Sequence, residues 1–424
     1  MSLHKLYRRT CYGLVAIVLL VSRLRASVQI NKPERRISDL KKVCGVITTI
    51  LEINQAVVHA TTNTSMSLVV VGDLKTNHVE WTKFQANSGG AVVYLSPTDQ
   101  RRLPFHIMRH IPWNHFGRKS IGFLYAVAGG CEKIYDFDDD NHLNQKNGLD
   151  SHDDWSYFRA VRARSNGIHV FNPYAYFRPN GTKLVWPRGF PLQFIRDERT
   201  YHVGSAHLEE VPIDASNAKV AIVQSLANHD PDVDAIYRLT QSLPITFNRQ
   251  GTVLIPERGL YTPWNAQAVL ISYPAFFGML LPVTVTGRVS DIWRSYITTR
   301  LLWETGFNVA FTSPFVTQFR NPHNYMVDFL DEDDLYKRVD ELLSVLSSWT
   351  SKQFQSLDAA YLDLVTHLVK VSGILGHDDL LLARAWVKDL QEAGYVWPKI
   401  LRRMDKRHHT SAPVVDERKV GEVP

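Results

Sequence analysis

From Lys41 onward, short apolar runs alternate with amphipathic stretches. Runs rich in β-branched residues predict four buried strands, at 41–50, 67–71, 91–95 and 133–137. The stretches at 51–60 and 118–128 have helical periodicity. Strands and helices that alternate at this spacing indicate an α/β fold whose sheet is mostly parallel in its first half. In such sheets, ligands bind at the carboxyl ends of the strands.

The second half of the chain has a less regular pattern. It predicts strands at 167–171, 219–223 and 266–271, separated by connections rich in proline and aromatic residues, and a strong helix at 291–304. From Asp331 onward the periodicity is helical, with amphipathic stretches at 333–349, 357–372 and 378–393. The predicted fold is therefore a mixed α/β sheet flanked by helices, with a C-terminal helical appendage.

An apolar run near the N-terminus, Cys11–Val21, has basic residues on both sides. A helix that crosses a bilayer needs about 20 apolar residues, so this run fits either a secretory signal or a short uncleaved anchor. The bulky Leu24 spoils the small-x-small pattern before Ala26, so we expect an uncleaved type II anchor with the body in a lumen. Two N-glycosylation sequons, at Asn63 and Asn180, are compatible with that location.

These patterns divide the chain into six segments. They are a cytosolic tail (1–10), a signal anchor (11–22), a basic stem (23–41), an α/β domain (42–330), a helical C-terminal region (331–400) and a flexible tail (401–424).

Positive charge is confined to the two ends of the chain. The net charge is +6, but residues 1–42 hold ten Lys and Arg against two Asp and Glu, and residues 399–424 hold seven against four. The middle of the chain therefore carries −5. Binding to a nucleic-acid backbone requires a clustered basic face, so we expect no nucleic-acid partner.

Three cysteines give little indication of redox chemistry. Cys11 lies in the apolar run, which leaves Cys44 and Cys131, both in or beside predicted strands. One disulfide or two buried free thiols fit this placement, and we expect the free thiols.

The most informative string, KIYDFDDDN, is a predicted strand that runs directly into carboxylates. Asp136 is followed by three consecutive acids, Asp138 to Asp140. Carboxylates this close repel one another unless a cation or hydrogen bonds neutralise them. The string therefore indicates a divalent metal site, although an exposed acidic turn remains an alternative.

Three kinds of metal site fit the acids to different degrees. An EF-hand starting at Asp136 would need Gly and Glu where the chain has Asn141 and Asn147, which excludes it. An aspartyl-phosphate phosphatase would use Asp136 and Asp138, but its acids usually end the first strand of a domain. An Asp-x-Asp pair of Asp138 and Asp140 would hold Mn²⁺ or Mg²⁺ against the diphosphate of a nucleotide sugar, and we favour this interpretation.

Longer strings carry a resemblance to a known family. The chain resembles the STELLO-type glycosyltransferase-like family from about Lys42 to Trp397. The strings are HIPWNHFGRKSIGFLYAVAGGCEKIYDFDDDN, VFNPYAYF, WPRGFPLQFIRD, QSLANHDPDVDAIYRLT, GRVSDIWRSYITTRLLWETG and RNPHNYMVDF. More distantly, DFDDDN, RGFPL, ANHDPDVDA and SDIWRSY are similar to segments of the reversibly glycosylated polypeptides, the UDP-arabinopyranose mutase family.

The resemblance implies a GT-A-like, Rossmann-like domain over 42–330 that binds Mn²⁺ or Mg²⁺ and a UDP-sugar. It also implies a single-pass type II protein of the Golgi membrane with a lumenal domain. In plants it implies a role in the assembly and delivery of cellulose synthase, although the plant proteins are considerably longer. The implied partners are a nucleotide sugar, a glycan or protein acceptor, other membrane glycosyltransferases and a second copy of the chain.

The same resemblance implies roles for individual residues on the donor side. Asp138 and Asp140 would hold the metal with His323 of RNPHNY, although a lone loop histidine is often structural. Asp73 and Lys75, after the second strand, would hold the nucleotide. Arg118 and Lys119 would neutralise the diphosphate oxygens, with surface charge as the alternative.

On the acceptor side, Asp291 would be the general base of an inverting transfer, or else Ser290 or Asp291 caps a helix. Trp293 and Arg294 would border the acceptor. Arg188 of RGFPL matches the arginine that becomes glycosylated in the reversibly glycosylated polypeptides, and a structural salt bridge is the alternative.

Three possible functions follow, two of them catalytic and one not. The favoured one is a metal-dependent, nucleotide-sugar glycosyltransferase of the secretory pathway. The others are a non-catalytic assembly or trafficking factor for membrane proteins, and a UDP-sugar mutase.

Overall fold

The computed structural model describes residues 40–62, 64–143, 159–165, 167–181, 184–201, 208–211, 219–248, 251–321 and 323–401. The predicted cytosolic tail, anchor and nearly all of the stem, the tail beyond Leu401 and the sequon asparagine Asn63 lie outside these residues. Within the described ranges, no helix combines the length and the hydrophobicity that a membrane crossing requires.

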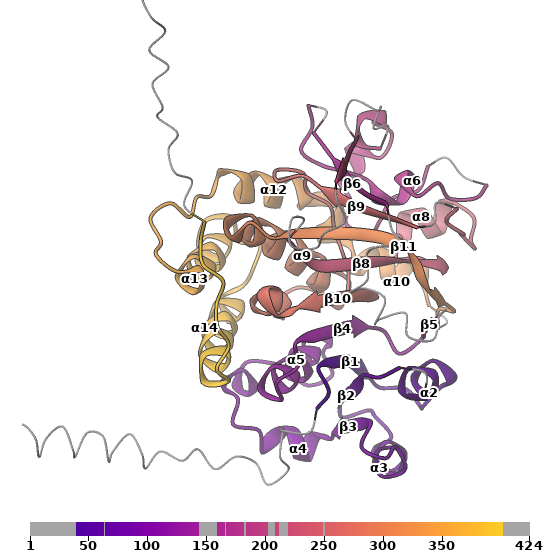
Figure 1. The fold of residues 1–424 in the computed structure, drawn as a ribbon, viewed down its shortest axis with the longest axis vertical. Helices are drawn as coiled ribbons and strands as arrows, with labels where there is room; N and C mark the ends of the chain where they lie inside the picture. The colour runs from indigo at the N-terminus through magenta and orange to yellow at the C-terminus, as the bar shows by residue number, and fades with distance from the viewer. Residues whose placement is uncertain are drawn as a thin grey trace, which may run out of the picture.

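The described chain forms one mixed sheet of eleven strands in the order β3-β2-β1-β4-β10-β8-β11-β9-β6-β7, with β5 paired to β11 (Figure 1). The strands are β1 (Val43–Thr49), β2 (Ser67–Gly72), β3 (Val92–Leu95), β4 (Lys133–Phe137), β5 (Asn141–Leu143), β6 (Arg159–Ala163), β7 (Leu208–Val211), β8 (Val220–His229), β9 (Thr252–Pro256), β10 (Ala268–Ser272) and β11 (Asn308–Gln318).

The first four strands pair in parallel, as the sequence predicts, and β10 then pairs antiparallel to β4. The strands predicted at 219–223 and 266–271 correspond to β8 and β10. The strand predicted at 167–171 is wrong, because only Val170 makes an isolated bridge there, to Tyr261. The apolar side chains of this segment are buried against other parts of the protein without a continuous hydrogen-bonded strand pairing of the backbone. Hydrophobicity alone does not distinguish these two cases.

Helices cover both faces of the sheet. They are α2 (Gln55–Thr62), α3 (His78–Asn87), α4 (Pro97–Arg101), α5 (Lys119–Ala128), α6 (Pro173–Tyr176), α8 (Ala235–Thr240), α9 (Gly287–Thr305), α10 (Tyr325–Asp331), α11 (Asp333–Lys337), α12 (Val339–Ser348), α13 (Leu357–His367) and α14 (His377–Glu392), with a π-helical turn at Leu368–Ser372. The predicted helix at 51–60 begins later, at Gln55, and the helix predicted from Asp291 begins earlier, at Gly287.

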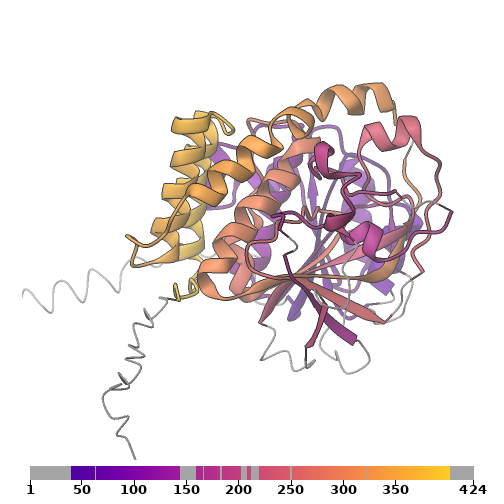
Figure 2. The ribbon, with the colours of Figure 1, turned by 90° about the horizontal axis from the view of Figure 1, so that it is seen from above.

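Alternation along the strands creates two apolar cores, one on each face. Val69 and Val71 of β2 face a large core that also contains residues of α5, α9 and α12 to α14, whereas Leu68 and Val70 face a smaller core under α2 and α3. Figure 2 shows the C-terminal helices, in orange and yellow, together at one side of the molecule. They share their core with the sheet, which leaves the opposite, carboxyl edge of β1 and β4 available for a site.

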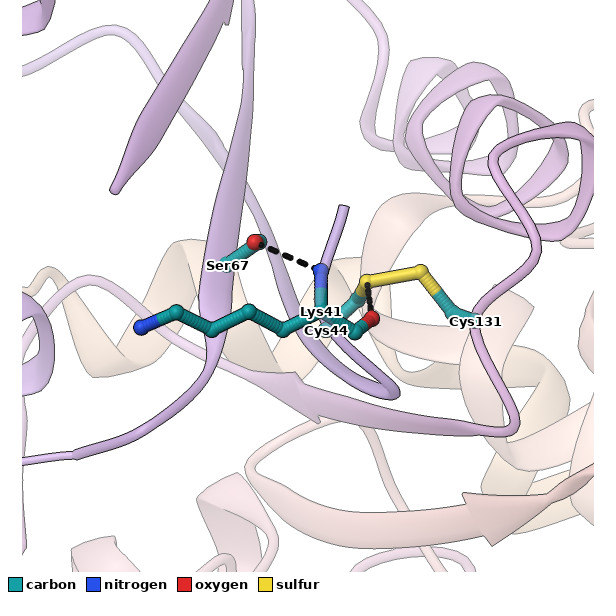
Figure 3. The surroundings of a disulfide bond; sticks show 4 residues. All are labelled: Lys41, Cys44, Ser67 and Cys131. Atoms are coloured by element: carbon teal, nitrogen blue, oxygen red, sulfur yellow. Dashed lines mark hydrogen bonds between the residues drawn. A yellow bond between two sulfur atoms is a disulfide. The ribbon is translucent and has the colours of Figure 1, made fainter. Parts of the chain in front are cut away.

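Cys44 and Cys131 form a disulfide, so the expectation of two free thiols is wrong (Figure 3). β1 and β4 are parallel neighbours with Cys44 paired to Ile134, and Cys131 lies just before β4. The two cysteines therefore meet at the amino end of these strands with their Cα atoms 6.0 Å apart, a separation that a disulfide spans without distortion. Strand adjacency, which spacing along the chain does not reveal, decides the pairing.

Candidate functional site

The acidic string ends β4 in the middle of the sheet, between β1 and β10, and opens into a pocket of about 330 Å³. The predicted residues Asp138, Asp140, Arg188, Asp291 and His323 all line this pocket. Further lining residues come from β1, α9, α10, the end of β11 and several connecting segments: Thr48, Phe116, Asp139, Asp232, Ala266, Gln267, Gly287, Arg288, Gln318, Arg320, Asn321 and Asp331. The sheet thus brings together residues that are far apart in the sequence, at the edge where α/β proteins bind ligands.

Beneath the pocket floor, Asp136 holds the acidic loop in place. Its carboxylate is fully buried and forms ion pairs with the Lys119 ammonium at 2.6 Å and the Arg294 guanidinium at 2.8 Å. Lys119 also donates to the Phe137 carbonyl oxygen at 2.7 Å and lies 3.7 Å from Asp138. Lys119 therefore contacts the loop from the protein interior, and does not line the pocket itself.

The three acids after β4 have different partners. Asp139 accepts from the Thr49 hydroxyl at 2.5 Å, and its carbonyl oxygen accepts from the Asn54 amide at 2.8 Å. Asp140 accepts from the Gln318 amide nitrogen, 3.1 Å from each of its oxygens. Asp138 keeps 39% of its side-chain surface exposed. Asp139 and Asp140 thus hold the loop in place through these hydrogen bonds, and all three acids line the pocket.

Electrostatics leave Asp138 with an excess of negative neighbours. Its low-dielectric surroundings at the pocket floor raise the pKa of Asp138 to about 8; Asp140, Asp136 and Asp139 add to the rise, and Lys119 opposes it. Burial also raises the pKa of Asp139. A cation at this floor would remove the repulsion, so the carboxylates fit a hard divalent metal.

His323 lines the same pocket, and its Nδ1 lies 3.2 Å from Asp328 Oδ1. With Nδ1 as the donor to a carboxylate, Nε2 is the nitrogen that would face a metal, an arrangement common among metal-bound histidines. Among the described residues, however, the ligand atoms of His323, Asp138 and Asp140 do not form a group within 4.8 Å of one another. A metal held by all three would require the segment after β11 to move toward the acidic loop.

Arg188 is clamped between two aspartates on the wall of the pocket. Its guanidinium donates to Asp232 at 2.9 and 2.8 Å and to Asp291 at 3.0 and 2.8 Å, and the side chain is almost fully buried. Burial alone would raise the pKa of Asp232, but the pairing with Arg188 prevails and lowers it to about 2. This geometry corresponds to the salt bridge that the sequence left open as the alternative for Arg188.

Asp291 lies within the first turns of α9, not at its N-cap, which is Thr286, so the capping alternative is wrong. Both of its oxygens contact Arg188, and Oδ2 also accepts from the Ala266 amide at 3.1 Å. Trp293 is fully buried in the core, so the prediction that it borders the acceptor is also wrong.

Besides Lys119, three residues predicted to bind the donor lie outside the pocket lining. Asp73 is buried and accepts from the backbone amides of Leu74 and His115, whereas Lys75 is exposed. Arg118 is buried, with its guanidinium 3.4 Å from the centre of the Trp113 ring and a hydrogen bond to Gln100. Arg118 is therefore not the surface charge that the sequence offered as its alternative.

Sequence reasoning missed Asp232, Arg288, Gln318 and Arg320. Asp232 lies in ANHDPDVDA and Arg288 in GRVSDIWRSY, strings already singled out for their resemblance. Gln318 ends β11, a strand that the sequence pattern did not predict, and Arg320 follows it. Gln318 and Arg320 lie near the acidic loop because β5 pairs with β11, which places Asn141 opposite Gln318.

Fold and site together define an α/β protein with a charged ligand-binding pocket at the carboxyl edge of its sheet. Residues 288–421 match the family model of the STELLO glycosyltransferases. Two curated Arabidopsis thaliana proteins, "Probable glycosyltransferase STELLO1" and "Probable glycosyltransferase STELLO2", are each 32% identical, over 73% and 74% of this chain. The chain is therefore a relative of the STELLO glycosyltransferases, which confirms the resemblance carried by its motifs. It spans 40% and 41% of the length of those two relatives.

Solved structures give more distant likenesses. A mycobacterial protein has a TM-score of 0.35 at 10% identity over 77% of this chain and 83% of its own. The mannosyltransferase PcManGT from Pyrobaculum calidifontis, in complex with GDP-Man and Mn²⁺, has a TM-score of 0.32 at 12% identity. The match covers 88% of this chain and 94% of the mannosyltransferase chain. Likenesses this distant do not establish a shared active site.

Proposed function

We propose that this protein is a metal-dependent glycosyltransferase of the GT-A type that binds a nucleotide sugar, a UDP-hexose, in the pocket at the end of β4. The observation that carries the proposal is that Asp138 and Asp140 both line a charged cavity, in a chain related to the STELLO glycosyltransferases. A cavity of about 330 Å³ lies within the range of small-molecule sites.

Asp138 and Asp140 are the proposed ligands of Mn²⁺ or Mg²⁺, with His323 as a third. Carboxylate oxygens suit these hard cations, and the pKa of Asp138 is raised by burial and by the neighbouring carboxylates, which a cation would offset. When bound, the metal would stabilise negative charge on the departing diphosphate. Lys119, held by Asp136 under the loop, adds a second positive charge close to Asp138.

Asp291 remains the proposed base for the acceptor hydroxyl, and Arg188 its positioning partner. Since both Asp291 oxygens contact Arg188, a role as base requires the acceptor to share or displace one of these hydrogen bonds. Asp73 and Lys75 remain the proposed residues of the nucleotide site, at the nucleoside end of a donor that extends beyond the pocket.

A ligand-dependent melting experiment tests the proposal. UDP with Mn²⁺, at about 100-fold over its Kd, should add about 2.7 kcal/mol of stability to the wild type. Asp140→Asn should lose this gain, whereas Asp378→Asn, which changes an exposed acid on α14, should keep it. If no nucleoside diphosphate raises the melting temperature of the wild type, the proposal fails and a non-catalytic assembly factor is favoured.

A donor screen separates the two catalytic alternatives. Release of the nucleoside diphosphate in the presence of an acceptor indicates a transferase, whereas conversion of the sugar nucleotide without an acceptor indicates a UDP-sugar mutase. The Asp140→Asn variant should be inactive in either assay.

We also propose the lumen of the Golgi as the location, with the protein held by its N-terminal segment as a type II anchor. The Cys44–Cys131 disulfide supports this, because structural disulfides persist in oxidising compartments and are rare in the cytosol. Asn180 is exposed, so its sequon should carry a glycan in a lumenal protein. Loss of a band shift after endoglycosidase treatment in Asn180→Gln would support the location, and protease sensitivity of the body in intact microsomes would contradict it.

A further inference from the structure

Three arginines line the pocket, Arg188, Arg288 and Arg320, and a fourth, Arg238, is buried close enough to Arg320 to act on its charge. Three of these four have close carboxylate partners. Arg188 pairs with Asp232 and Asp291, Arg238 with Asp230, and Arg288 with the fully buried Glu332. Arg320 is different.

Arg320 is buried with only a long ion pair. Only 8% of its side chain is exposed, yet its guanidinium makes no hydrogen bond to any described residue, and the buried Nε has no hydrogen-bond partner among them. Its ion pair is with Asp328, whose Oδ2 lies 3.9 Å from Nη2, beyond hydrogen-bonding distance, and Asp328 also contacts His323. Burying a guanidinium without hydrogen bonds costs free energy, so folding alone does not explain this arrangement.

The surroundings of Arg320 add positive charge. Burial, together with the charges of Arg238 and Arg288, lowers the pKa of Arg320 to about 10, and Asp232 and Asp230 oppose this shift. Arg320 lines the pocket beside Arg288 and Asn321. It follows the end of β11, two residues after Gln318, whose amide nitrogen contacts Asp140. The chain at the end of β11 therefore places Gln318 against the acidic loop and Arg320 in the basic part of the pocket lining.

We propose that Arg320, with Arg288 beside it, binds a phosphate group of a ligand in this pocket. A guanidinium presents donors in a planar fork that matches phosphate oxygens, and the hydrogen-bond partners that Arg320 lacks among the described residues are then supplied by the ligand. The phosphate comes either from the diphosphate of the donor or from an anionic acceptor. Arg118 and Lys119, predicted for this role, already have partners elsewhere. The inference deepens the proposed function but depends only on anion binding.

The test uses the full chain and inorganic pyrophosphate without divalent metal. Pyrophosphate should bind the wild type, and Arg320→Gln should weaken binding by about tenfold or more, because hydrogen bonds to charged groups contribute about 1.5–3 kcal/mol each. Arg384→Gln, which removes an exposed arginine on α14, is the matched control and should bind like the wild type. Arg320→Lys should bind with intermediate affinity, because it keeps the charge and loses the fork.

Melting without ligand separates binding from a structural role. If Arg320 binds a ligand and does not stabilise the fold, Arg320→Gln should melt at the same or a higher temperature than the wild type. The reason is that the substitution removes a buried charge that makes no hydrogen bond to a described residue. A lower melting temperature with unchanged pyrophosphate affinity would overturn the proposal, as would a wild type that binds no pyrophosphate.

Binding of UDP and of inorganic phosphate identifies the source of the phosphate. Loss of UDP affinity in Arg320→Gln places the donor diphosphate at Arg320. Unchanged UDP affinity with lost phosphate affinity assigns the site to an anionic acceptor. If UDP with Mn²⁺ fails to stabilise the wild type while pyrophosphate still binds through Arg320, the anion site stands and the glycosyltransferase proposal fails.

Discussion

The disulfide between β1 and the start of β4 should contribute strongly to the stability of the half of the sheet that carries the acidic loop. Cys44 and Cys131 are 87 residues apart in the sequence. Closing a loop of this length in the unfolded chain gives about 4.6 kcal/mol in the chain-entropy model. With an unfolding entropy of about 2.1 cal/mol/K per residue over 424 residues, this energy corresponds to a melting shift of about 5 °C.

The perturbation is the double variant Cys44→Ala and Cys131→Ala, compared with the wild type with and without a reductant. Both sulfurs are buried, so alanine leaves the strands intact at the cost of a small cavity. Differential scanning fluorimetry should show the double variant about 5 °C below the oxidised wild type and close to the fully reduced wild type. Intact mass after alkylation under denaturing, non-reducing conditions should show no modification of these two cysteines in the wild type.

Two results would refute this reasoning. Alkylation of both cysteines in protein purified without a reductant would show that the disulfide does not form. A double variant that melts with the oxidised wild type would show that the cross-link does not limit the unfolded chain as the loop length implies.

Three further predictions concern the pocket wall. Arg188→Met should cost about 3–5 kcal/mol, since it leaves Asp232 and Asp291 buried without their cation, and a change below about 1 kcal/mol in urea unfolding would contradict the role of the ion pairs. Gly189→Ala should cost about 2–4 kcal/mol, because Gly189 has φ of +79° and a Cβ would lie 2.3 Å from Ile292 Cγ2; an unchanged melting temperature would refute this. The folded-state pKa of Asp232 is lowered, so its contribution of about 2 kcal/mol is complete above about pH 4 and is lost as the pH falls toward 2. The stability difference between wild type and Asp232→Asn should therefore shrink over that range, and a constant difference would show that Asp232 does not titrate there.

The strands and helices in the first half of the fold could be predicted because each is determined by residues close together in the sequence. Each parallel strand there is a short run rich in β-branched or aromatic residues. The helix over 118–128 was predicted to within one residue of α5 for the same reason. The strand order was not predicted, because it depends on which strands pair. The hydrophobic pattern gave no correct prediction where contacts between residues distant in the sequence determine the secondary structure. Val170 is buried without a ladder, and β11 has no regular alternation, with a bulge between Thr312 and Val316.

Part of the site could also be predicted, namely the residues whose signal lies within a short stretch of sequence. Asp138 and Asp140 stand out because consecutive carboxylates at a strand end need a counter-charge wherever the chain folds. The partners of Arg118, Lys119 and Arg188 could not be predicted, since the choice between ligand binding and an internal ion pair depends on which acids come within 3 Å. Lys119 pairs with Asp136, 17 residues away in the sequence, and Arg188 with Asp291, 103 residues away.

The pocket combines two electrostatic imbalances of opposite sign. At the floor, burial and clustered carboxylates raise the pKa of Asp138, and on the wall the Arg320 guanidinium makes no hydrogen bond to a described residue. Lys119 lies 3.7 Å from Asp138 and Asp328 lies 3.9 Å from Arg320, so among the described residues each charge has only one distant partner of opposite sign. A ligand that carries a divalent cation and a phosphate would neutralise both at once. This complementarity favours a nucleotide-sugar site over a scaffold, since a protein that only binds partners through its surface would gain nothing from a cavity with both imbalances.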